Sequence, residues 1–106
     1  MTTLKHIVMW KLHEHAEGAD KATNVRLMKD KLLACAQLSS GTLRFEVVTA
    51  QEAHAQGLEA TYDIVLFSEF TDKAALDAYA EHPQHVALKG FIGAIRESRQ
   101  CMDWES

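Results

Sequence analysis

The stretch LKHIVMWKL, residues 4–12, carries apolar side chains on both sides of what its composition marks as a β-strand. β-Branched and aromatic residues are enriched in strands, and successive side chains of a strand point to opposite faces. Val8 and Trp10 therefore share one face, and Ile7 and Met9 share the other. A sheet with helices on a single side needs only one apolar face. The second apolar face predicts that something else covers it.

Three more strands follow along the chain. The segments 42–50 and 62–70 are rich in β-branched and aromatic residues, and 98–104 alternates weakly. The segment 62–70 again has apolar residues on both faces.

Two of the three regions between the strands have helical periodicity, whereas residues 51–61 are a polar, alanine-rich connection. Apolar residues recur at intervals of three and four between Gly18 and Ser40, with Asp20 as the predicted N-cap and Gly41 as the predicted stop. A second helix follows a cap at Thr71 or Asp72 and continues to His82. The next residue is the only proline in the chain. A residue before proline is disfavoured in the α region, so a third, short helix should begin at residue 83.

This order of elements predicts an α+β fold of the ferredoxin-like type. The expected protomer is a split βαββαβ unit with a four-stranded antiparallel sheet and helices on one face. It occupies the whole chain, residues 1–106, as a single domain. Because the helices cover one apolar face of the sheet, the other is expected to meet a second copy, giving a homodimer joined sheet to sheet as a dimeric α/β barrel.

Composition excludes several classes of partner. The formal net charge is −4, with acidic and basic residues interspersed, so no basic stripe favours nucleic acid or an anionic membrane. No segment approaches the roughly 18 apolar residues that span a bilayer. The first residues lead directly into a strand pattern rather than a signal-peptide pattern, which predicts a cytoplasmic location.

The sequence resembles the stress-responsive dimeric α/β-barrel (Dabb) family. The similarity rests on LKHIVMWKL at the start, YDIVLFSEFTDKAALDAYAEHPQH in residues 62–85, and CMDWE in residues 101–105. Its most specific element is Tyr79 followed three residues later by a His-Pro-x-His motif. The resemblance implies a barrel-forming dimer with a pocket in each protomer between sheet and helices.

One branch of that family, similar to plant polyketide cyclases of the olivetolic acid type, closes a linear polyketide by aldol chemistry with a histidine and a tyrosine. By position, the resemblance implies His85 as general base and Tyr79 as hydrogen-bond donor to a carbonyl oxygen. Asp103 is the implied carboxylate that orients His85. The implied ligand-lining residues are His6, Val8, Trp10, Leu66, Leu88 and Phe91. Such chemistry needs a base with a pKa near neutrality and a donor aimed at the developing oxyanion.

Alternatives to catalysis stay open. In the leading interpretation, each pocket binds a small apolar or aromatic molecule, with lyase or cyclase turnover by His85 and without a cofactor. The second interpretation is a non-catalytic stress-related or interaction protein whose barrel dimer is structural. In this interpretation, His85 bonds to exposed backbone groups and the Tyr79 ring packs in the core. A monooxygenase of another dimeric barrel type ranks lower. No metal site is predicted, because Pro83 breaks the helix between His82 and His85, so that the two side chains should not share a face.

Overall fold

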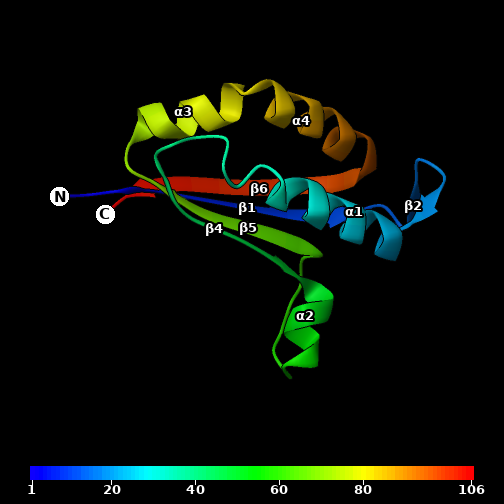
Figure 1. Ribbon diagram of the computed structural model, residues 1–106. Coiled ribbons are helices and arrows are strands. Elements are labelled where there is room, and N and C mark those ends of the chain that lie inside the picture. The colour runs from blue at the N-terminus through cyan, green and yellow to red at the C-terminus, as the bar shows by residue number, and fades with distance from the viewer.

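The computed structural model describes all residues from 1 to 106, and its elements follow the predicted order with small additions (Figure 1). Strands and helices run in the order β1 (Leu4–Leu12), β2 (His15–Ala16), β3 (Ala19–Asp20), α1 (Lys21–Leu33), β4 (Thr42–Thr49), α2 (Ala50–Ala55), β5 (Ile64–Phe70), α3 (Lys73–Glu81), α4 (Pro83–Ile95) and β6 (Arg96–Glu105). No helix is both long and apolar enough to cross a membrane.

The main sheet has four antiparallel strands in the order β4-β5-β1-β6, which confirms the ferredoxin-like arrangement. Strands β1 and β5, whose sequences are apolar on both faces, are its two central strands. The register places His6 opposite Asp103 and Trp10 opposite Arg99. Directly opposed residues of an antiparallel pair point to the same face, so β1 and β6 together build one wall from alternate residues.

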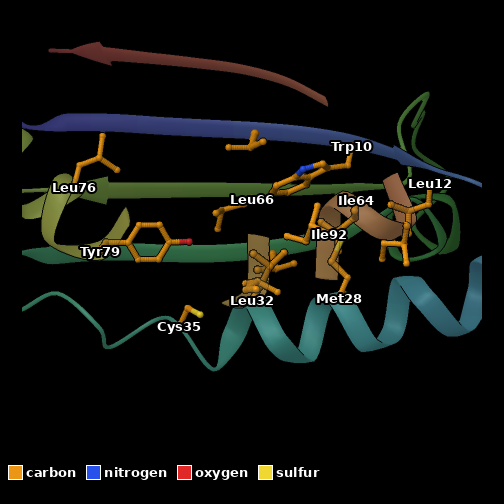
Figure 2. Packing of buried hydrophobic residues seen from close by; sticks show 14 of the residues in the cluster. Trp10, Leu12, Met28, Leu32, Cys35, Ile64, Leu66, Leu76, Tyr79 and Ile92 are labelled. Carbon is orange, nitrogen blue, oxygen red and sulfur yellow. The ribbon is translucent and has the colours of Figure 1, made fainter. Parts of the chain in front are cut away.

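Helices α1, α3 and α4 cover one face of the sheet (Figure 1), here called the inner face. The buried core lies between this face and the helices, as Figure 2 shows for many of its side chains. Its strand residues include Val8, Trp10 and Leu66, and its helix residues include Met28 and Ile92. The core therefore uses only one of the two apolar faces of β1 and β5.

The opposite, outer face of the sheet carries the second set of apolar side chains. Ile7 and Met9 are partly exposed there, and β6 adds Met102 and Trp104, which are 63% and 37% exposed. Helix α2 projects away from the sheet on the side opposite the other three helices (Figure 1). Within one chain, no other helix lies on this side of the sheet (Figure 1).

Three local features differ from the sequence expectation. Helix α4, expected to be short, has 13 residues and is as long as α1. Helix α1 ends at Leu33, with Ala34 as its C-cap, so Gly41 does not end it. Gly41 instead allows close packing, because a Cβ there would lie 2.4 Å from the Cβ of Ala75. The segment after β4, which has a polar and alanine-rich sequence, forms α2 because Thr49 and Glu52 make a capping box.

Candidate functional site

A cavity of about 490 Å³ lies between the inner face of the sheet and helices α3 and α4. Its walls combine apolar side chains of the core with ionisable groups. They include seven of the nine site residues expected from the sequence: His6, Val8, Trp10, Leu66, Tyr79, His85 and Asp103. The cavity is within the size range of small-molecule sites in proteins.

The other two expected lining residues, Leu88 and Phe91, do not reach this cavity. They border a separate hollow beside α1, where Lys31 lies 5.0 Å from the centre of the Phe91 ring. The reason is helical geometry. His85, Lys89 and Ile92 recur at intervals of four and three residues and share the cavity side of α4, whereas residues 88 and 91 lie on the side facing α1.

The junction between α3 and α4 sets the position of His85. Pro83 is the first residue of α4, and His82 caps that helix by accepting a hydrogen bond from the Gln84 N–H at its Nδ1, 3.1 Å away. In a continuous helix, the Gln84 N–H would donate to the Ala80 carbonyl four residues earlier. Here that carbonyl accepts a hydrogen bond from Nδ1 of His85 at 2.9 Å. The break in the helix therefore leaves free the acceptor that holds the imidazole.

This hydrogen bond fixes the tautomer of His85. A carbonyl oxygen only accepts, so Nδ1 carries the proton and the neutral ring keeps the lone pair of Nε2 free. Burial lowers the pKa of His85, the Ala80 carbonyl opposes this effect, and nearby cations, first Lys89, lower the pKa further. The imidazole is therefore held in its neutral, basic form around neutral pH.

Tyr79 lies beside His85, with ring centroids 4.5 Å apart. Its ring also packs edge-on to Phe45 and against Phe70 in the core. The side chain is 1% exposed, and its hydroxyl has no hydrogen-bond partner within the chain. Burial raises the pKa of Tyr79 far above its ordinary value. The phenol thus stays protonated and is a free donor on the cavity wall.

Asp103 does not orient His85, contrary to the expectation from the sequence. Its carboxylate accepts a hydrogen bond from Nδ1 of His6 at 2.5 Å. The strand register explains the pairing, because residues 6 and 103 are directly opposed on β1 and β6. The cavity thus holds two separate imidazoles, one oriented by a backbone carbonyl and one by a carboxylate.

Four cationic residues of the cavity wall were not predicted: Lys73, Lys89, Arg96 and Arg99. Two signals could have indicated them. Lys89 and Arg96 follow His85 at helical intervals of four and eleven residues, and Arg99 alternates with Asp103 along the last strand.

Other parts of the molecule offer weaker sites. A hollow of about 580 Å³ beside the start of α1 is larger, but its lysines are already paired: Lys21 with Glu14 and Asp63, and Lys29 with Glu52. No group of three or more His, Cys, Asp or Glu side chains is arranged to hold a metal ion.

Comparison with known proteins gives a consistent family assignment. The sequence model of the stress responsive A/B barrel domain, Dabb, matches residues 4–106. A dimeric protein of unknown function with a ferredoxin-like fold from Bacteroides fragilis is 30% identical, with a TM-score of 0.79 over 98% of this chain and 96% of the other. No curated protein matches the sequence.

Two more distant structures share the fold alone. A Dabb family protein from Mesorhizobium loti is 21% identical, with a TM-score of 0.71 over 98% of this chain and 96% of its own. SnoaB, a cofactor-independent oxygenase from Streptomyces nogalater, is 10% identical, with a TM-score of 0.72 over 98% and 92% of the two chains. Proteins with this fold thus include both an enzyme and proteins of unknown function.

Proposed function

Because the chain belongs to the stress responsive A/B barrel domain family, we propose that it is a homodimer that binds a small apolar or aromatic carbonyl compound and acts on it through His85 and Tyr79. The observation that carries the proposal is the buried Tyr79 hydroxyl, which lacks a partner and lies beside a neutral imidazole on a cavity wall. A buried donor without a partner is costly unless a ligand uses it.

The dimer is supported by the outer face of the sheet. Its apolar side chains, including Met102 and Trp104, would be covered by the same face of a second copy. Helix α2 and the segment after it border a hollow of about 270 Å³ on this face, lined by residues such as Ile7, Met9 and Val65. The related Bacteroides protein is described as dimeric. An isologous contact of two such faces gives the closed dimeric barrel.

The proposed chemistry is proton removal next to a carbonyl group. Nε2 of His85 takes a proton from the carbon, the electron pair of the broken C–H bond forms a new C=C bond, and the π electrons of the C=O bond move onto the oxygen. Tyr79 donates a hydrogen bond to the oxygen as it becomes negative. In a cyclase, the resulting enolate attacks a second carbonyl, and the alkoxide that forms takes the proton back from the His85 imidazolium. When no second carbonyl is present, the enolate is reprotonated by that imidazolium. No redox cofactor is required for these steps.

Exchange of α-protons tests this proposal directly. An aryl methyl ketone is dissolved in D₂O, and its methyl signal is monitored by proton NMR. The signal should decay faster with the protein than without it, as the methyl protons exchange for deuterium. General base catalysis by one positioned side chain typically contributes about 10²- to 10⁴-fold. His85→Gln should abolish the acceleration. His54→Gln, which changes an exposed histidine of α2, should leave it intact.

The same assay distinguishes the proposed enzyme from a second candidate function, a non-catalytic barrel protein. That candidate is favoured by the packing of Tyr79 against Phe45 and Phe70, which gives the ring a structural role. Binding of the ketone by calorimetry, without exchange above the buffer rate, would refute the catalytic part of the proposal and leave a binding protein.

A further inference from the structure

Two buried hydrogen-bond donors without partners lie on the wall of the same cavity. They are the hydroxyl of Tyr79 and the indole Nε1–H of Trp10, whose side chains are 1% and 4% exposed. Figure 2 shows the Tyr79 hydroxyl pointing along the inner face of the sheet toward Leu66, with Trp10 farther along. Buried donors are nearly always paired, so two of them at one cavity indicate a ligand with oxygen acceptors.

The charged groups around the cavity add a second, independent feature. Both carboxylates of the wall are already paired: Asp77 with Lys73 at 3.0 Å and Asp103 with His6. The other three cations, Lys89, Arg96 and Arg99, form no salt bridge. Three cations without a carboxylate partner thus line this cavity, although the chain carries a net charge of −4.

Burial separates the two groups of donors. Lys89, Arg96 and Arg99 are exposed, whereas Trp10 and Tyr79 are buried. Arg99 lies directly opposite Trp10 in the strand register, and its side chain makes one hydrogen bond within the chain, to Sγ of Cys101 at 3.4 Å. The cavity therefore has exposed cations at its mouth and buried neutral donors in its interior, and buried apolar side chains such as Val8 and Leu66 complete its wall.

We infer that the ligand of this cavity is an organic acid whose carboxylate binds the cationic mouth and whose apolar body carries a carbonyl or hydroxyl oxygen for Trp10 and Tyr79. The inference rests on the proposed function and specifies its substrate class. A guanidinium offers paired N–H groups that match the two oxygens of a carboxylate. Trp10 becomes a hydrogen-bonding residue for the ligand, in addition to an apolar wall.

A matched pair of probes tests the charge requirement. 6-Hydroxy-2-naphthoic acid and 6-hydroxy-2-naphthamide have nearly the same shape and the same distal hydroxyl, but only the first is an anion. Titration calorimetry on the full-length protein should show that the acid binds roughly tenfold more tightly, since hydrogen bonds to charged groups are the stronger ones. The advantage should shrink as salt is added, because the cations are exposed.

Variants separate the two groups of donors. Arg96→Gln and Arg99→Gln should each weaken binding of the acid by roughly threefold to tenfold and leave the amide unchanged. Arg26→Gln, at the hollow beside the start of α1, is the control and should leave the affinity for both probes unchanged. Trp10→Phe keeps an aromatic ring but removes the N–H. It should weaken binding of the acid and of the amide equally, by roughly threefold to tenfold.

The outcomes distinguish this inference from the proposed function. If acid and amide bind equally and the arginine variants change nothing, the anionic end is refuted. The proposed function then still stands, provided that Tyr79→Phe weakens both probes. If neither probe binds at its solubility limit and the aryl ketone shows no enzymatic proton exchange, the proposed function fails and the inference with it.

Discussion

Replacing Tyr79 by phenylalanine should make the ligand-free protein more stable while it removes function. The substitution deletes one hydroxyl and keeps the ring that packs against Phe45, Phe70 and His85 at centroid distances of 5.7, 5.5 and 4.5 Å. Most core substitutions destabilise a protein. A gain in stability would therefore be diagnostic of a hydroxyl retained for a ligand.

The size of the effect follows from the environment of the hydroxyl. A buried polar group without a partner costs about 1–3 kcal/mol. The Tyr79 oxygen faces a cavity and not close-packed atoms, so we take the lower end, about 1 kcal/mol. For a domain of this length, 1 kcal/mol corresponds to a rise of about 4 °C in the midpoint of thermal unfolding.

Chemical and thermal denaturation followed by circular dichroism measure this gain. Tyr62→Phe is the matched control, because Tyr62 is the other tyrosine of the chain, is partly exposed and lies beneath Lys11, so its loss should change stability little. Tyr79→Phe should also lose most of the stabilisation that a bound ketone gives. A variant less stable than the wild type, with undiminished ligand binding, would show that the hydroxyl is structural and would refute the reasoning.

Three further predictions concern pH, packing and assembly. Because burial lowers the pKa of His85 below its ordinary 6.5, stability from the neutral imidazole is complete above pH 6.5 and is lost as the pH falls from there through the lowered pKa. In His85→Gln, the midpoint of thermal unfolding should depend less on pH in that window. The activity of the wild type should decline only below pH 6.5. Gly41→Ala should lower the free energy of unfolding by about 1–3 kcal/mol through contact with Ala75, whereas Gly90→Ala, with open space around it, should raise it slightly in denaturant titrations. Met102→Glu should weaken the proposed dimer by roughly a hundredfold or more, because it places an unpaired charge in the interface; light scattering that still shows a dimer at low micromolar concentration would contradict the outer-face contact.

The fold was predictable from the sequence because its signals are local and repeated. The β-branched and aromatic composition of β1 and β5, the cap at Asp20 and the break at Pro83 each act within a few residues, and the two strands, the cap and the break are all found in the structure. The His-Pro-x-His motif also placed His85 and Tyr79 on one cavity. These two side chains come from adjoining helix ends, so their separation depends on a short stretch of chain.

The remaining site residues depended on information that is not local. The partner of Asp103 is decided by the register of β6 on β1, which the weak alternation of the last strand could not fix. The resemblance implied Leu88 and Phe91 as lining residues, but they face the hollow beside α1, and the apolar pattern of the segment could not show which neighbouring element each residue meets. Helix α2 was missed because its capping box lies at the end of a strand that reads as continuous.

Strand β6 connects the two proposed roles of the sheet. It is an edge strand that pairs with β1 along its length, yet nearly all its residues are exposed in the single chain. Arg99 and Asp103 point to the cavity, while Met102 and Trp104 point to the outer face. A slip of one residue would exchange these sets, because side chains alternate along a strand. Covering the outer face with a second chain would therefore also hold the His6–Asp103 pair and the cationic mouth in register, so that assembly of the dimer and integrity of the site depend on the same strand.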